Sequence, residues 1–150
     1  MIRITKLADY GIVLLTHLAM GERGALHTAQ GLSARSRVPL PTASKLLQAL
    51  ARAGLVVSHR GRNGGYGLAR DADRISVAEV ISAIEGPIGL TECGSGEAGA
   101  CDLESVCAAR GRWEPISRAV ERALRDVPLS AMRPQGEGLV RIQAPSGARP

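Results

Sequence analysis

Apolar residues near the start of the chain recur at helical spacing, at Leu7, Tyr10, Leu14 and Leu18, and further apolar residues widen this stripe. A helix that is apolar nearly all round is normally buried in the protein. Glycines at positions 21 and 24 then interrupt the pattern. We therefore expect the chain to begin with a buried helix that ends near residue 20.

Two short helices separated by a tight turn are predicted next. Thr28 can cap a helix that runs to about Ser36, because its hydroxyl can accept a hydrogen bond from a free backbone N–H. Pro41 suits the first position of the following helix, where its missing N–H has no partner to lose. The apolar residues of this second helix share one face: Ala43, Leu46, Leu47 and Leu50. Its polar residues share the opposite face and are free to meet a partner: Thr42, Lys45, Gln48 and Arg52.

A β-hairpin is predicted after these helices. Residues 55–59 and 66–69 are strand-like, and an Asn63-Gly64 pair stands between them, which is a strong hairpin signal. Arg60 and Arg62 fall at the tip of this hairpin. The order of a helix, a helix-turn-helix and a hairpin with a basic tip predicts a winged helix.

Two more helices are predicted beyond the hairpin. Ser76 and Glu79 fit a capping box that opens a helix closed by Gly86. After the cysteines, a charged segment carries an apolar stripe at helical spacing: Ile116, Ala119, Val120, Ala123 and Leu124. A domain of this size does not need an extra amphipathic helix, so we expect the stripe to form a dimer interface. Packing against the chain's own domain is the alternative.

The predicted fold is mainly α, a winged helix-turn-helix with a small β-hairpin wing, a cysteine loop and a long C-terminal dimerisation helix. We assign residues 1–87 to a winged-helix DNA-binding domain, 88–112 to a loop that we call the cysteine segment, 113–132 to the dimerisation helix and 133–150 to a flexible tail. The 150 residues include one Trp, two Tyr and no Phe, which favours a core of aliphatic residues on packed helices.

Charge is unevenly distributed and indicates a nucleic-acid partner. Residues 1–70 hold ten Lys or Arg and two acidic residues, a net charge of +8, whereas residues 71–150 carry −3. A small basic domain favours a polyanion, and an α-helix fits the major groove of double-stranded DNA. The candidates for contacts with base edges are Thr42, Ser44, Lys45 and Gln48, and those for contacts with phosphates or the minor groove are Arg60, Arg62 and Asn63. The alternative is an ordinary solvated surface.

Other classes of function are disfavoured. The chain has no apolar run of the roughly 18 to 20 residues that a membrane span needs, and we expect a cytoplasmic protein without a membrane partner. No paired acid-base or nucleophile arrangement is present, so we predict no catalytic residues, no enzyme activity and no small-molecule substrate. An electron-transfer metalloprotein is disfavoured because a DNA-binding module is present.

The only three cysteines of the chain, Cys93, Cys101 and Cys107, lie within fifteen residues. In a reducing compartment, clustered thiols are more often metal ligands than disulfides. Thiolates are the preferred ligands of iron in iron-sulfur clusters. Structural zinc usually has two cysteines two to four residues apart, which this chain lacks. Zinc, a thiol redox switch and purely structural cysteines stay open as alternatives.

Several motifs together resemble one bacterial family. They are ITKLADYG at residues 4–11, LARAGLV at 50–56, RGRNGGYGLA at 60–69, the segment 75–87 and the three cysteines. This pattern is similar to the Rrf2-type winged-helix transcriptional regulators, which include the regulators of the Isc and Suf iron-sulfur assembly systems and the nitric-oxide sensor NsrR. Residues 90–113 look most like the Suf-system branch. The resemblance implies a homodimer that binds an iron-sulfur cluster, [2Fe–2S] or [4Fe–4S], and acts on a DNA operator as a regulator, and specifically as a repressor, of cluster-assembly genes.

The resemblance also implies a fourth cluster ligand. The Isc branch has a His three residues after its third Cys, but Arg110 stands there in this chain. In the NsrR branch an Asp from the partner subunit completes the site, and Asp9 stands at the matching position, so Asp9 is our expected ligand. A solvent-facing Asp9 paired with Lys6 is the alternative. Acids nearer in sequence are further candidates: Glu97, Asp102 and Glu104. Ser44 stands where the Isc regulator has an acid, so its operator is not transferred to this chain.

Overall fold

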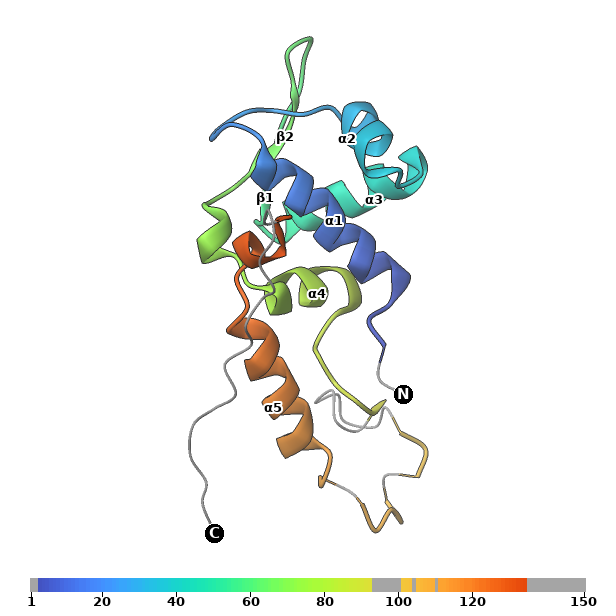
Figure 1. The fold of residues 1–150 in the computed structure, drawn as a ribbon. Helices are drawn as coiled ribbons and strands as arrows, with labels where there is room; N and C mark the ends of the chain where they lie inside the picture. Colours follow the sequence, from blue (N-terminus) through green and yellow to red (C-terminus); the bar gives the residue numbers. More distant parts are fainter. Residues whose placement is uncertain (1–2, 93–100, 104, 110, 135–150) are drawn as a thin grey trace.

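The computed structural model describes residues 3–92, 101–103, 105–109 and 111–134. It is mainly helical, as predicted, with one small antiparallel sheet in the described part of the chain. The elements in chain order are α1 (Lys6–Met20), α2 (Ala29–Ser36), α3 (Leu40–Arg52), β1 (Val56–His59), β2 (Gly65–Leu68), the 3-10 helix η1 (Ala72–Arg74), α4 (Val77–Glu85), α5 (Glu114–Arg125) and the 3-10 helix η3 (Leu129–Met132). Figure 1 shows the wing at one end of the molecule and the described part of the cysteine segment at the other.

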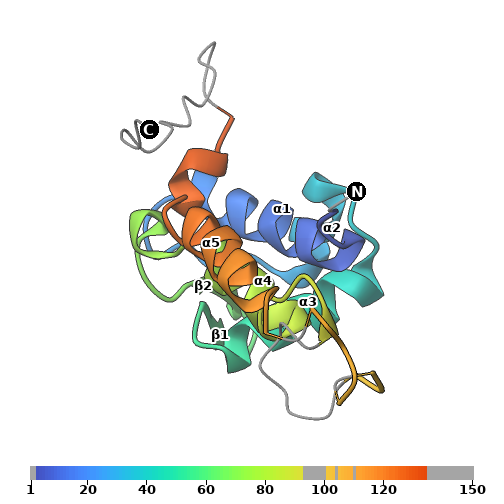
Figure 2. The ribbon, with the colours of Figure 1, turned by 90° about the horizontal axis from the view of Figure 1, so that it is seen from below.

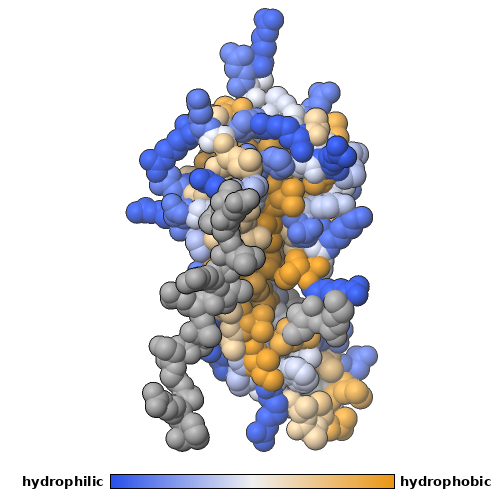
Figure 3. Space-filling view, viewed as in Figure 1, coloured by the Kyte–Doolittle hydropathy of each residue, from blue (hydrophilic) through white to orange (hydrophobic). Residues whose placement is uncertain are grey.

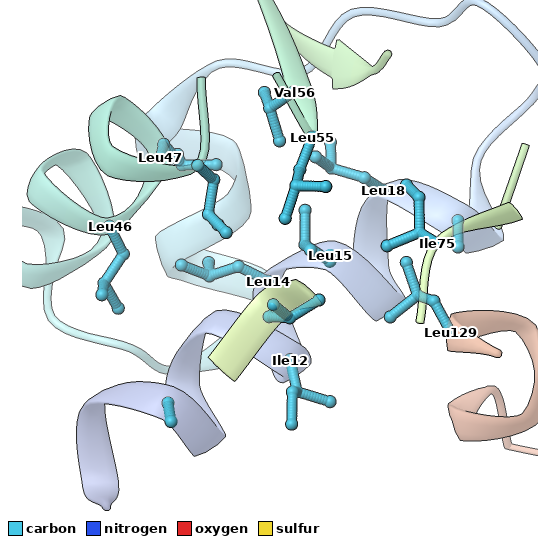
Figure 4. Packing of buried hydrophobic residues seen from close by; sticks show 14 of the residues in the cluster. Ile12, Leu14, Leu15, Leu18, Leu46, Leu47, Leu55, Val56, Ile75 and Leu129 are labelled. Carbon is cyan, nitrogen blue, oxygen red and sulfur yellow. The ribbon is translucent and has the colours of Figure 1, made fainter. Parts of the chain in front are cut away.

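Helix α1 runs through the centre of the fold and contacts α2, α3, α4 and η3. Thr5 caps it, because the Thr5 hydroxyl accepts a hydrogen bond from the Ala8 amide at 3.1 Å. The predicted buried helix is confirmed: Leu14 and Leu15 are fully buried among side chains of α3, the wing and the C-terminal segment (Figure 4). Leu7 differs from the predicted stripe, since 49% of it is exposed. The next residue, Ala8, is fully buried in the core instead.

Helix α4 packs closely against α1. The predicted capping box is present: the Glu79 amide donates to the Ser76 hydroxyl at 3.2 Å, and the Ser76 amide donates to the Glu79 carboxylate at 2.8 Å. Gly11 of α1 lies under Ile84 of α4, so near that a Cβ on Gly11 would stand 2.1 Å from the Ile84 Cδ1 atom. The absence of a side chain at position 11 therefore brings the two helices together.

The predicted helix-turn-helix is confirmed. The Thr28 hydroxyl accepts a hydrogen bond from the Gly31 amide at 3.0 Å and caps α2. Helix α3 starts at Leu40 and not at Pro41, so Pro41 is its second residue. Either position in the first turn tolerates a missing N–H. The buried face of α3 is the predicted one: Ala43, Leu46, Leu47 and Leu50.

The predicted hairpin forms the wing. Strands β1 and β2 pair antiparallel from Val56 opposite Leu68 to His59 opposite Gly65. Gly61 has φ +108°, and a Cβ on Gly64 would stand 2.2 Å from the His59 carbonyl oxygen, so the wing turn requires glycine at both positions. His27, just before α2, exchanges two backbone hydrogen bonds with Tyr66, at 2.9 and 2.8 Å. The wing is therefore attached to the helix-turn-helix at its base.

The C-terminal segment belongs to the winged-helix core. The predicted dimerisation helix at 113–132 is helical only as α5, which ends at Arg125, and the chain then turns at Pro128 into η3. Residues 127–129 run antiparallel to residues 75–77: the Val77 amide donates to the Val127 carbonyl at 2.9 Å, and the Leu129 amide to the Ile75 carbonyl at 2.7 Å. Leu129 is fully buried. Seen from below, α5 lies across α4 (Figure 2).

Candidate DNA-binding surface and cysteine segment

The solvent face of α3 carries part of the predicted set of base-contacting residues. Lys45, Gln48 and Arg52 are exposed, whereas Thr42 and Ser44 are half-buried at the borders of the face. The helix is amphipathic because the four buried aliphatic residues hold its opposite side against α1 and α2. Lys45 and Gln48 are therefore the predicted candidates that α3 presents most directly.

The wing turn, residues 60–64, presents the other predicted contacts. Arg60, Arg62 and Asn63 are all exposed there. An open hollow of about 550 Å³ lies between the wing and α3, and Gln48, His59 and Arg60 line it together with the start of α2. Hydrophilic side chains surround this end of the molecule (Figure 3). The structure thus places the basic wing beside the polar face of α3, separated by a hollow.

Sequence reasoning missed an exposed apolar pair at the start of α3. Leu40 is 42% exposed, and Pro41 beside it is also exposed. Leu40 is thus not part of the buried face of α3, which begins at Ala43. The prolines at 39 and 41 could have indicated this position, because they mark the start of a helix, and Leu40 stands between them.

His27 joins the wing to α2 through its side chain as well as its backbone. The guanidinium of Arg35, in the last turn of α2, donates to the Nδ1 atom of His27 at 2.9 Å, since an arginine can only donate. The Nε2 atom is buried without a hydrogen-bond partner among the described residues. Burial first, and then the charge of Arg35, lower the pKa of His27 below its ordinary value. The environment between the wing and α2 therefore favours the neutral imidazole of His27.

Two of the three predicted thiol ligands lie in the described part of the cysteine segment. Cys101 and Cys107 are free and half-buried, and each lies next to a turn in the stretch before α5. Cys93 lies outside the described residues, as do Glu97, Glu104 and Arg110. Among the residues described, no three metal-ligating side chains come together. The described residues thus offer two partly accessible thiols, Cys101 and Cys107, and thiols are ligands that suit a thiolate-binding metal centre.

Asp9 lies in the first turn of α1, at the end of that helix away from the wing (Figure 1). It is exposed, and its carboxylate has no hydrogen bond or ion pair with another described residue. Lys6, the expected alternative partner, instead places its ammonium 5.5 Å from the centre of the Tyr10 ring. Asp102 is exposed in the cysteine segment. The Asp9 carboxylate is thus accessible to a group outside its own chain.

The five residues predicted for a dimer interface divide into two groups. Ile116 is 48% exposed, and Ala119 and Ala123 are also exposed. Val120 and Leu124 are half-buried and line a groove of about 300 Å³ with residues 3–5 and 85–90. Leu124 also packs against the core of its own chain. One side of α5 therefore packs on its own chain, and the other side faces solvent.

A winged helix-turn-helix with a polar recognition helix and a basic wing defines the class of DNA-binding transcriptional regulators, not enzymes. Residues 4–134 match the family model described as Rrf2, iron-dependent transcriptional regulator, and the chain belongs to this Rrf2 family. The family resemblance found in the sequence is therefore confirmed. No helix in the described ranges combines the length and apolar character needed to cross a membrane.

Two curated relatives and one solved structure illustrate the similarity. The transcriptional regulator IscR of Xenorhabdus nematophila is 32% identical over 130 residues, covering 87% of this chain and 78% of the relative. The regulator NsrR of Shouchella clausii is 29% identical over 109 residues, 73% of each chain. The structure of CymR, the global cysteine regulator of B. subtilis, superposes with a TM-score of 0.65 at 28% identity and covers 86% of this chain and 94% of CymR.

Proposed function

We propose that this regulator is a homodimer that binds an iron-sulfur cluster and controls, as a repressor, the genes of a SUF cluster-assembly system, with cluster state setting its affinity for an operator. The observation that carries the proposal is the pair of free, half-buried thiols of Cys101 and Cys107. They belong to the cysteine segment, whose described part lies at the end of the molecule away from the wing (Figure 1). The family description as iron-dependent regulators supports the same chemistry.

The proposed ligands are Cys93, Cys101 and Cys107 of one chain and Asp9 of the partner chain. Thiolates suit iron, and three of them leave one position for a different donor. An exposed carboxylate without a partner among the described residues suits that position, because it gives up no interaction seen there when it binds. When bound, the cluster supplies a centre that oxidation, nitrosylation or iron loss can remove.

A second copy of the chain would cover exposed apolar residues at the start of the chain and on α5. Ile4 and Leu7 are each 49% exposed, and Ile116 is 48% exposed. The groove beside them contains the half-buried Val120 and Leu124. Burial of apolar surface of this kind is the usual driving force of subunit association. In such a dimer the winged helices would meet two half-sites of an imperfect palindrome.

Contacts between helices could transmit a movement of the cysteine segment to the recognition helix. The hydroxyl of Thr5 at the start of α1 donates to the carboxylate of Glu85 at the end of α4, at 2.6 Å. The chain leaves α4 there and enters the cysteine segment, while α1 packs on α3. A shift of residues 86–92 on cluster loss would therefore act on α4 and α1, which hold the recognition helix in place.

The proposed DNA contacts follow from exposure on α3 and the wing. Lys45 and Gln48, with Thr42 and Ser44 at the borders, would reach base edges, and Arg60, Arg62 and Asn63 would reach phosphates or the minor groove. Leu40 adds an apolar group at the N-terminal end of α3. An apolar side chain at this position suits the C5-methyl group of thymine.

Anaerobic purification followed by iron, sulfide, zinc and visible-absorption analysis tests the proposal. We expect iron and acid-labile sulfide in the wild-type chain, and an altered absorption spectrum or faster cluster loss in Asp9→Ala. The control is Asp73→Ala, which removes an exposed acid from η1 and should leave both properties unchanged. A colourless protein with stoichiometric zinc and no sulfide would refute the cluster.

A regulator that uses its cysteines for zinc or thiol redox sensing is the second candidate. Free, half-buried thiols are also the groups that oxidants modify, and the solved structure of CymR belongs to a regulator named for cysteine. Thiol titration before and after mild peroxide treatment separates this candidate. Reversible loss of titratable thiols in an iron-free protein, together with a change in DNA affinity, would favour it over the cluster.

A further inference from the structure

Arg37 has an unusual backbone conformation in the turn between α2 and α3. Its φ and ψ are 59° and 14°, the left-handed region, and it is the only residue other than glycine with a positive φ among those the structure describes. Glycine adopts this conformation without strain, whereas the Cβ atom of any other L-residue meets the following carbonyl oxygen. An arginine here therefore destabilises the turn relative to glycine.

Hydrogen bonds between α2 and Val38, the residue after Arg37, hold the turn in this conformation. The Ser36 hydroxyl accepts a hydrogen bond from the Val38 amide at 3.2 Å, and the Ser33 hydroxyl donates to the Val38 carbonyl at 2.7 Å. The Val38 side chain is 1% exposed and anchored in the core. Because the residues around it are fixed, Arg37 cannot relax by moving the turn.

No interaction within the described chain explains an arginine at this position. Arg37 is exposed, and its guanidinium has no hydrogen bond or ion pair with a described residue. By contrast, Arg35 two residues earlier donates to His27. A residue that lowers stability and has no partner among the described residues is better explained by a partner outside the chain.

The position of Arg37 indicates the chemistry of that partner. Arg37 stands three residues before Leu40, at the N-terminal end of α3, and this end of a recognition helix is the one that reaches the bases in helix-turn-helix proteins. The sugar-phosphate strands border the groove that the helix enters, and the guanidinium matches a phosphate with two parallel N–H groups. Lys45 and the wing arginines are further exposed basic residues of the same winged helix.

We propose that Arg37 is a DNA-phosphate contact, retained in the helix-turn-helix turn in spite of backbone strain. This inference rests on the DNA surface described under the proposed function. It adds a contact that fixes the register of α3 on the duplex, since phosphate contacts orient a protein without reading sequence. It also predicts a trade-off, in which the turn is more stable with glycine and binds DNA better with arginine.

The test uses the full-length chain and a duplex that it selects from a random library. Arg37→Gly should raise the thermal midpoint by about 2–4 °C, from the strain expected at one residue in a chain of this size. It should also weaken DNA binding by roughly tenfold, as expected when one charged hydrogen bond is removed. The slope of log affinity against log salt should fall by about 0.9, the value for one phosphate that the protein no longer neutralises.

Three further variants separate charge from backbone strain. Arg37→Asn removes the charge, tolerates the left-handed conformation, and should lower the salt slope as Arg37→Gly does. Arg37→Lys keeps the charge and should keep the wild-type slope. Arg122→Ala removes one exposed arginine from α5 and should leave the slope unchanged.

Two results would overturn the proposal: an unchanged salt slope in Arg37→Gly, or an equal decrease of the slope in Arg122→Ala. A wild-type chain that selects no duplex would instead refute the DNA surface on which the proposal rests.

Discussion

Replacing Leu129 with Ala tests whether the segment after α5 is part of the winged-helix core. Leu129 is fully buried in η3, within the cluster that includes Leu15, Leu18 and Ile75 (Figure 4). The substitution removes three carbon atoms from the core, which lowers the free energy of unfolding by about 2.4 kcal/mol through reduced burial alone. A cavity that does not collapse adds to this loss, so we expect about 3 kcal/mol or more.

Urea unfolding followed by far-ultraviolet circular dichroism measures this loss as a lower midpoint at an unchanged slope. Met132→Ala is the matched control, because it truncates a large apolar side chain of the same 3-10 helix that is 42% exposed. We expect it to cost less than about 1 kcal/mol. Equal midpoints for the two variants would refute the reasoning, because η3 would then contribute no more from its buried residue than from its exposed one.

The remaining predictions concern DNA contacts and pH. Arg62→Ala should weaken DNA binding and lower the salt slope by about 0.9 if it neutralises one phosphate, and an unchanged slope in salt-dependent binding assays would remove Arg62 from the phosphate contacts. Replacing thymine with uracil at one operator position should weaken binding of the wild-type chain but not of Leu40→Ala, which a double-mutant cycle measures. The pKa of His27 is lower in the folded chain than its ordinary value of about 6.5, so its contribution to stability is fully present above that value and is lost as the pH falls below it. The urea midpoint should therefore drop less between about pH 7.5 and pH 5.5 in His27→Gln than in the wild type, whereas the exposed-histidine control His59→Gln should keep the wild-type drop.

The features that local chemistry determines could be predicted from the sequence. The capping box of Ser76 and Glu79, the Thr28 cap and the glycine-rich wing turn depend on residues only a few positions apart, and all three form as expected. The buried face of α3 was equally predictable, because helical periodicity alone defines it.

Features that depend on distant contacts were not predictable in the same way. Leu129 follows a proline and belongs to no periodic pattern, so nothing local indicates that it is buried against residues from the other end of the chain. Leu7 has the spacing of a buried residue but is exposed, whereas the adjacent Ala8 is buried. The left-handed backbone of Arg37 has no signal in its residue type, because most turns place glycine there.

The same distinction between local and distant determinants applies to the predicted DNA and cluster residues. The positions of Lys45 and Arg62 follow from secondary structure, and the structure places both on the surface where they were expected. Asp9 was assigned from resemblance alone, and its carboxylate is exposed without a partner among the described residues, as a ligand to a second subunit requires. The fourth-ligand assignment itself stays a prediction.

A partly buried hydrogen bond joins the two ends of the loop that carries the cysteines. The Leu90 amide, just after α4, donates to the hydroxyl of Ser117 in α5 at 3.1 Å across 27 positions of sequence, and Ser117 is only 2% exposed. Most of the entropy of bringing the two ends of this loop together is therefore lost when the protein folds. For the proposed iron-sulfur cluster, this closure would raise the effective concentration of the cysteine ligands, as tethering does. If the chain binds the proposed cluster, Ser117→Ala should speed cluster loss by loosening this closure, although it removes none of the proposed ligands.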